Sequence, residues 1–415
     1  MGKPLQSSLF SLVGDLKGCS GALALSLLHA LLFIEPPSLS LISATLTLEV
    51  PLFAIKHNRA NSSNKPRKMG SIQGILAVSD NESPHNLPFD ALPDKRRVWP
   101  SKPGSPEEGL GRLVLLTPDV VSSAAKSCIV TGQRVSLNWD LTKLDIANFN
   151  RAPTQHHITS LLGGAGFDDV YIFNPQQSSQ WDGLRHFSAP FPTAEEPSRR
   201  LFYGGTKASE IVDRSSDRIG MQYWAREGIC GRGVLLDYAA YAERKGIAYS
   251  ALSDHSISLA VLKEIAQEQG LKFRRGDILF VRIGLTKEWD TRMSAADKMD
   301  YARSSNPQHA GVEGTEEMLR WIWDEGFAAV AGDAVSFEVY PPKKSYTRAD
   351  GSVEQGLFMH EYLIAGWGLA VGELFDLEEL SRKCHELGRW DFFVASAPLN
   401  MPGGVSSPPN CLAIF

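Results

Sequence analysis

Cysteine is scarce in this sequence, and its spacing argues against a disulfide framework. The 5 cysteines form no Cys-x-x-Cys pair, and their number is odd. A set of structural disulfides and a zinc knuckle are therefore both excluded as the organising principle of the fold. Reduced thiols are typical of cytosolic proteins, so we expect a cytoplasmic location.

Runs of basic residues with interleaved aromatic side chains are also missing. The formal net charge is −5 and the isoelectric point is about 6.1. This mildly acidic balance gives a nucleic acid no electrostatic attraction, because its phosphates need a basic surface. We therefore expect a small-molecule substrate as partner and no nucleic acid.

Apolar runs of membrane-spanning length are absent from most of the chain. Residues 21–34 form an apolar run of 14 residues, as the numbering shows, and residues 39–55 form a second apolar stretch. A membrane helix needs about 20 residues. The segment 1–68 is then a targeting signal, an anchor or a non-native extension, with Met69 as an alternative start. A membrane partner is expected only if the first run is native.

The rest of the chain divides into a linker and one folded body. Residues 69–108 are rich in proline, serine and charge and are interpreted as a linker or arm. Residues 109–415 mix strand and helix patterns, which predicts a single mixed α/β domain with a central mixed sheet or barrel and flanking helices. The expected strands are 170–174, 278–283, 327–331 and 411–415, and the expected helices are 233–244, 258–269 and 316–325.

Two pairs of residues could carry chemistry. Asp182 and His186 follow the expected strand 170–174, where a carboxylate can hold a metal and an imidazole can move protons near neutral pH. His360 lies in an apolar stretch, and Glu373 follows it 13 residues later. Imidazole nitrogen and carboxylate oxygen suit zinc or manganese. Either spacing alone is common in proteins without such a site.

Several blocks in order along residues 108–415 resemble a known family. Residues 176–186 align with a His-x-Gly-Thr-His-x-Asp-x-Pro-x-His signature, residues 231–237 read Gly-Arg-Gly-Val-Leu-Leu-Asp, and residues 273–282 contain Arg-Arg-Gly-Asp-Ile-Leu-Phe. The stretches 326–333 and 360–373 fit as well. Together they resemble the cyclase family that includes bacterial kynurenine formamidase and isatin hydrolase.

The resemblance implies roles for individual residues. Asp182, His360 and Glu373 match metal ligands, and His186 matches the catalytic general acid/base. Two histidines of the signature are glutamines here, Gln176 and Gln180. A neutral amide oxygen is a weaker zinc ligand than imidazole. One divalent metal, zinc or manganese, is expected, with both glutamines as candidate ligands.

The resemblance also implies an activity. We expect metal-dependent hydrolysis of a carbon–nitrogen bond in an amide, formamide or lactam, similar to an arylformamidase of tryptophan catabolism. Trp181 is predicted to line an aromatic substrate pocket. A cyclase or dehydratase of secondary metabolism and a degenerate, non-catalytic binding protein stay open as alternatives. Relatives are commonly oligomers, so a homo-oligomer is expected.

Overall fold

The computed structural model describes residues 83–144, 149, 151–348 and 350–415. The predicted apolar run 21–34 and the alternative start at Met69 lie outside these residues. Within the described ranges, no helix combines the length and the hydropathy that a bilayer crossing requires.

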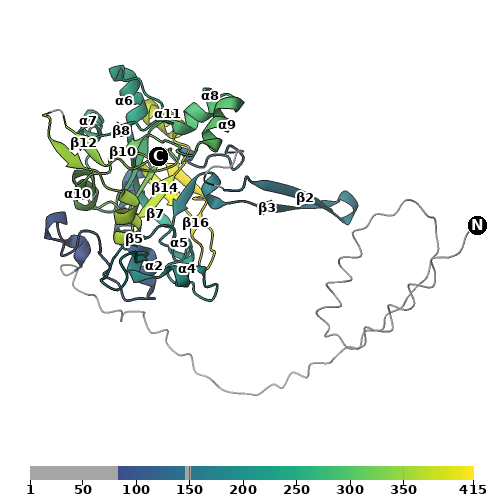
Figure 1. Cartoon of the computed structure of the whole chain (residues 1–415). Helices are drawn as coiled ribbons and strands as arrows, with labels where there is room; N and C mark the ends of the chain where they lie inside the picture. Colours follow the sequence, from purple (N-terminus) through teal and green to yellow (C-terminus); the bar gives the residue numbers. More distant parts are fainter. Residues whose placement is uncertain (1–82, 145–148, 150, 349) are drawn as a thin grey trace, which may run out of the picture. The chain divides into compact units, whose positions relative to one another are not determined.

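A mixed sheet of nine strands forms the centre of the described domain (Figure 1). Its middle strands β7, β9, β11 and β14 are parallel, and the strands toward both edges are antiparallel. Parallel strands are buried on both faces, which explains the continuous apolar runs of this region. In sheet order the strands are β1 (Arg134–Ser136), β17 (Cys411–Ile414), β15 (Asp391–Ser396), β7 (Ile229–Asp237), β9 (Ile278–Arg282), β11 (Ala329–Gly332), β14 (Ala370–Glu373), β4 (Gln180–Asp182) and β16 (Ser406–Ser407).

Helices cover both faces of this sheet. Side chains alternate along each strand, so Leu279 and Val281 of β9 enter one core and Ile278 and Phe280 enter the other. The first core receives the apolar faces of α6 (Tyr238–Lys245), α7 (Leu259–Glu268), α8 (Leu285–Thr291) and α10 (Glu316–Asp324). The second core receives α5 (Gln222–Glu227) and α11 (Glu378–Leu387). The predicted fold class, a mixed α/β domain with a central sheet and flanking helices, is confirmed.

Short elements complete the domain. The remaining helices are α2 (Pro106–Leu110), α3 (Pro118–Cys128), α4 (Ala208–Val212) and α9 (Ala295–Arg303). Small two-stranded pairs are β5 (Ala189–Pro190) with β6 (Arg200–Leu201), β8 (Ser256–Ile257) with β10 (Gly311–Val312), and β12 (Ser345–Thr347) with β13 (Val353–Gln355). Single turns of 3-10 helix are η2 (Pro84–Asn86), η3 (Phe89–Ala91), η4 (Gly111–Leu115), η5 (Leu162–Gly164), η6 (Pro175–Gln177) and η7 (Tyr203–Gly205), and η8 (Glu361–Gly366) is a π-helix.

One helix expected from the sequence is wrong. The segment 233–244 is not one helix, because its first part continues β7 to Asp237 and only then does α6 begin. Apolar runs of this length fit a buried strand and a buried helix equally well. Within the predicted linker 69–108, the side chains of Phe89, Leu92 and Val98 are buried in the first core.

A long hairpin projects from the domain. Strands β2 (Gln155–Leu161) and β3 (Gly166–Ile172) pair only with each other and extend away from the sheet (Figure 1). The chain returns from this arm directly into η6, where the candidate site begins.

Candidate functional site

The segment from the arm to β4 is held in place by its own polar side chains. Asn174 accepts a hydrogen bond from the backbone N–H of Gln176 at 2.9 Å, which starts the turn η6. The hydroxyl of Ser179 donates to the carbonyl of Leu374 at 2.6 Å and accepts from the backbone N–H of Trp139. These bonds fix where β4 joins the sheet.

Strand register then brings three polar side chains together. β4 lies antiparallel to β14, with Gln180 opposite Glu373 and Asp182 opposite Val371. Residues directly opposite in a sheet share a face. Gln180, Asp182 and Glu373 therefore point to the same side, and all three are buried.

The two glutamines bind the carboxylates through their amide nitrogens. Gln180 Nε2 donates to Glu373 Oε2 at 2.8 Å and lies 3.3 Å from Asp182 Oδ1. Gln176 Nε2 donates to Asp182 Oδ1 at 2.9 Å. Each amide thus donates a hydrogen bond to a carboxylate oxygen. Without it, that oxygen would lie beside another carboxylate with no hydrogen-bond donor.

His186 is the most exposed residue of this cluster. Its side chain is 19% exposed, whereas that of Asp182 is 0% exposed. Gln176 Nε2 lies 3.0 Å from His186 Nδ1 and 3.3 Å from His186 Nε2, so the amide group faces both ring nitrogens. His186 Nε2 lies 3.7 Å from Asp182 Oδ2. Burial lowers the pKa of His186, although the negative charge of Asp182 acts in the opposite direction.

His360 is held between two carboxylates. Its backbone N–H donates to Glu338 Oε1 at 3.0 Å, and its Nδ1 lies 2.8 Å from the same oxygen. Its Nε2 lies 3.2 Å from Glu373 Oε1. Burial alone would lower the pKa of His360, but the charges of Glu338 and Glu373 raise it well above its usual value. Burial and the charge of Asp182 raise the pKa of Glu373 to about 7.

Glu338 is a member of this site that sequence reasoning missed. It lies between β11 and β12, 22 positions before His360, and is buried. Its burial opposes ionisation, but the charge of His360 lowers its pKa. The sequence offered no spacing signal, because only the fold places Glu338 under the imidazole.

The donor set fits one divalent cation. Ligand atoms of Asp182, His186 and His360 all lie within 4.8 Å of one another. Asp182 Oδ2 and Gln180 Oε1 are buried and accept no hydrogen bond. Buried acceptors without donors are rare unless an ion or water satisfies them. Asp182 and His360 would hold the ion, with His186, Gln180 Oε1 and Glu373 beside it.

The structure brings together six of the seven predicted site residues, and Trp181 is the exception. Neighbouring residues of a strand point to opposite faces, so Trp181 faces away from Gln180 and Asp182. Its indole is fully buried, packs on Phe375 with centroids 5.0 Å apart and donates to Ser396 Oγ at 2.9 Å. Trp181 is therefore a core residue and does not line the site.

Other aromatic side chains border the cluster instead. The Phe187 ring lies 5.0 Å from that of Phe358 and 5.5 Å from that of His360, measured between centroids. Both phenylalanines are half-buried. They form an apolar edge beside the exposed side of His186, whose ring centroid is 6.0 Å from that of Phe187.

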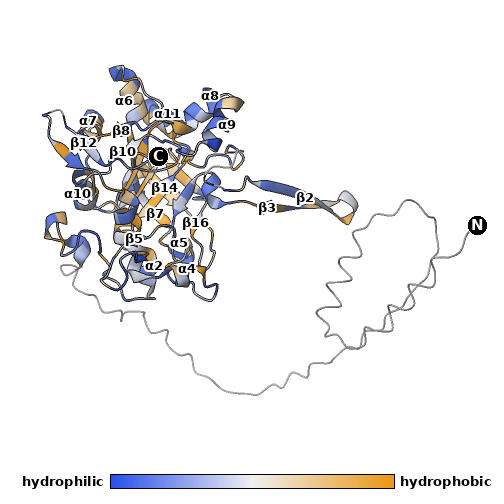
Figure 2. Cartoon of the chain, in the orientation of Figure 1, coloured by the Kyte–Doolittle hydropathy of each residue, from blue (hydrophilic) through white to orange (hydrophobic). Residues whose placement is uncertain are grey.

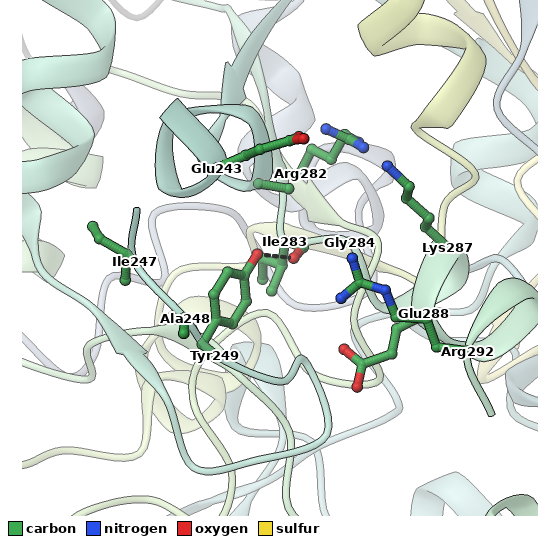
Figure 3. A pocket seen from close by; sticks show the side chains of 11 residues that line it. Glu243, Ile247, Ala248, Tyr249, Arg282, Ile283, Gly284, Lys287, Glu288 and Arg292 are labelled. Atoms are coloured by element: carbon green, nitrogen blue, oxygen red, sulfur yellow. Dashed lines mark hydrogen bonds between the residues drawn. The ribbon is translucent and has the colours of Figure 1, made fainter. Parts of the chain in front are cut away.

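The cavity in Figure 3 has a different lining and contains none of these residues. Tyr249, Arg282, Lys287 and Arg292 surround it, next to the turn between β9 and α8. Its most buried charge, Arg282, already pairs with Asp237 at 2.8 Å and with Glu378. This arrangement gives no support to a reaction centre there.

A comparison with known protein families shows which family the chain belongs to. Residues 91–339 match the sequence profile of the family described as "Putative cyclase", which is more than half of the chain. This chain belongs to the cyclase family. The family inferred from the ordered sequence blocks is thereby confirmed. Among curated proteins, no match to this chain was found.

A solved structure shows the same architecture. A crystal structure described as a novel cyclase shares 26% identity with this chain, covers 75% of it and 97% of its own chain, and has a TM-score of 0.61. Isatin hydrolase A from Labrenzia aggregata, bound to benzyl benzoate, is 14% identical over 71% of this chain and 97% of its own chain, with a TM-score of 0.46. Isatin hydrolase A from Ralstonia solanacearum is 13% identical over 72% and 97%, with the same TM-score of 0.46. The two isatin hydrolases are too distant to inform the chemistry of this chain.

Proposed function

We propose that this cyclase-family protein is a metal-dependent hydrolase of a carbon–nitrogen bond in an aryl formamide or lactam. The observation that carries the proposal is a partly exposed imidazole, His186, whose Nε2 lies 3.7 Å from the buried carboxylate of Asp182. A neutral imidazole can take a proton from water and return it to a leaving nitrogen. The Nδ1 contact with Gln176 keeps the ring in a fixed orientation.

The surrounding residues suit an aromatic substrate. Phe187 and Phe358 would pack against an aryl ring whose amide group reaches His186. A divalent ion, proposed as zinc or manganese, would polarise the amide carbonyl when bound. Asp182 and His360 would hold that ion, while Glu338 fixes the ring of His360.

Hydrolysis of an aryl formamide and of a lactam tests the proposal in the metal-supplemented protein. His186→Ala is expected to lower kcat about 10²–10⁴-fold, because it removes the proton-transfer group. Asp182→Asn is expected to lower activity together with metal content. His385→Ala is the matched control: this histidine lies on α11, packs on Trp390 and should leave the rate unchanged. Full activity in both site variants, or no hydrolysis of any carbon–nitrogen substrate by the metal-loaded wild type, would refute the assignment.

A further inference from the structure

A cavity lies beside the candidate site, where the strand β3 ends. Its volume of about 600 Å³ falls within the range of roughly 300–1,000 Å³ that is usual for small-molecule pockets. Gln176 and Ser406 are among the residues that line it. Gln176 also binds Asp182 of the candidate site, so the cavity and the site share part of a wall.

Strand register brings Ser406 to the same part of the sheet as the candidate ligands. Ser406 of β16 lies opposite Asp182 of β4. Residues directly opposite in a sheet share a face, so the side chains of Ser406 and Asp182 point to the same side. Because Ser406 lines the cavity, the cavity lies next to the position that an ion on Asp182 would take.

Gln176 is held in place through both its side chain and its backbone. Its Nε2 donates to Asp182 Oδ1 at 2.9 Å and lies 3.0 Å from His186 Nδ1. Its carbonyl accepts a hydrogen bond from Arg151 at 2.9 Å, and its backbone N–H donates to Asn174 Oδ1. The shared wall between cavity and site is therefore a fixed part of the structure.

Apolar side chains form most of the remaining lining. Figure 2 shows hydrophobic colour along β3, and this strand reaches the cavity with Ile172, which Phe173 follows. The loop between β15 and β16 contributes Leu399, Met401 and Val405, which are all exposed. A concave surface with apolar side chains and a few polar groups is typical of a small-molecule site.

The cavity is separate from the apolar edge of Phe187 and Phe358. Neither phenylalanine belongs to its lining, and both lie against His360, with ring centroids 5.5 Å and 5.4 Å away. The candidate cluster thus has two apolar neighbours. A substrate whose carbon–nitrogen bond lies at His186 can place one substituent on each of them. A formamide carries only hydrogen on its carbonyl carbon, so it would leave the cavity empty.

We propose that this cavity is an acyl pocket, and that the substrate is an N-aryl amide or lactam whose carbonyl carbon carries an apolar group of several carbons. The proposal rests on the proposed hydrolysis and selects among its substrates. The aryl ring lies on Phe187 and Phe358, and the apolar acyl group lies in the pocket. Hydrolysis breaks the bond between the carbonyl carbon and nitrogen. Water supplies a hydroxyl group to the carbon and a proton to the nitrogen, so an open-chain amide gives a carboxylic acid and an arylamine.

A series of anilides with lengthening acyl groups tests the pocket in the metal-supplemented full chain. From formanilide through acetanilide and butyranilide to hexananilide, kcat/KM is expected to rise about threefold to fourfold for each carbon that becomes buried. Values that stay flat or fall along the series would overturn the acyl pocket, while hydrolysis of formanilide would leave the proposed function in place.

Met401→Trp and Val405→Trp each add bulk at the wall of the pocket. Each is expected to lower the ratio of kcat/KM for hexananilide to kcat/KM for formanilide about tenfold or more. Val130→Trp is the matched control, because Val130 is an exposed residue outside the lining and should keep the wild-type ratio. The wild-type ratio in both pocket variants would overturn the proposal. Unchanged thermal midpoints verify that the variants are folded.

Binding without turnover separates the pocket from the chemistry. Isothermal titration of His186→Ala, alone and combined with Met401→Trp, measures the affinity for hexananilide and formanilide. Tighter binding of hexananilide by His186→Ala, with the difference lost in the double variant, supports the acyl pocket. Equal affinities for both anilides in His186→Ala would overturn it. If the wild type hydrolyses neither anilide but the binding difference is present, the proposed function fails and the pocket assignment holds.

Discussion

Gln180 sits where two carboxylates meet across neighbouring strands. Its amide nitrogen donates to Glu373 and lies within 3.3 Å of Asp182, so a neutral group separates two acidic ones. The sequence predicted that glutamines replace histidines here, because the motif could be aligned. It did not predict that the amide nitrogens face the carboxylates while Gln180 Oε1 stays without a donor. Side-chain orientation depends on all neighbours at once.

Glu338 illustrates what no sequence spacing could supply. It is far from every predicted site residue along the chain, and its role follows from contact with His360 alone. Carboxylates that bind the second nitrogen of a metal-ligating histidine orient the ring and raise its basicity.

Glu338→Gln is therefore expected to lower metal affinity about 10–100-fold, because the neutral amide no longer holds the Nδ1–H of His360. Isothermal titration with Zn²⁺ or Mn²⁺ measures the change. Glu338→Asp keeps the charge and should recover part of the affinity. Equal affinities in the wild type and Glu338→Gln would show that Glu338 does not position His360.

His85 makes folding sensitive to acid. Burial, with the nearby charges of Arg112 and Arg275, lowers the pKa of His85 to about 3. The folded state therefore binds the proton less readily than the unfolded chain. The stabilising contribution is present above the unfolded pKa of about 6.5 and is lost as the pH falls toward 3.

His85→Phe keeps a ring against Trp323 but cannot be protonated. Between pH 7 and pH 5 the wild type is expected to lose about 2 kcal/mol more stability than this variant. Denaturant unfolding at the two pH values measures the difference. Parallel losses in both proteins would exclude His85 as the source.

At the scale of secondary-structure elements, the observed bounds of helix α10 agree closely with the range predicted from the sequence. Thr315 caps it by accepting a hydrogen bond from the backbone N–H of Met318 at 3.2 Å, and Gly326 follows its end. Local signals of this kind act within a few residues, which is why α7 and α10 were predicted nearly to their bounds. β7 was misjudged because its burial on both faces depends on distant strands.

Thr315→Ala should destabilise the protein by about 1 kcal/mol, because the first turn of α10 loses its side-chain acceptor. Thr315→Ser retains the hydroxyl oxygen and should keep most of that stability. Thermal unfolding of the three proteins gives the comparison. A smaller loss in Thr315→Ala than in Thr315→Ser would contradict capping as the cause.

At the scale of the whole molecule, the sheet assembles a site from segments that are far apart in sequence. The family resemblance predicted six of the participants, since its blocks occur in order, but not Glu338. Strand register places the site segments around one point, and none of the sequence blocks specifies that register. These segments are η6, β4, β14 and the chain before η8.

A cation bound at this point should stabilise the fold as a whole. Anything that binds the native state alone raises the thermal midpoint with increasing concentration. Added Zn²⁺ or Mn²⁺ is expected to raise the midpoint of the wild type, and a chelator should reverse the shift. Asp182→Asn should respond much less. The same shift in the wild type and in Asp182→Asn would place the ion elsewhere.

β4 is short, yet it has a hydrogen-bonded neighbour on each side, β14 and β16. Its backbone is thus anchored independently of the side chains that it presents. Such a strand keeps its backbone in place when one of its side chains is replaced, so ligand residues on it can change one at a time. A substitution at position 180 would then change the ligand atoms offered to an ion while the strand keeps its place between β14 and β16.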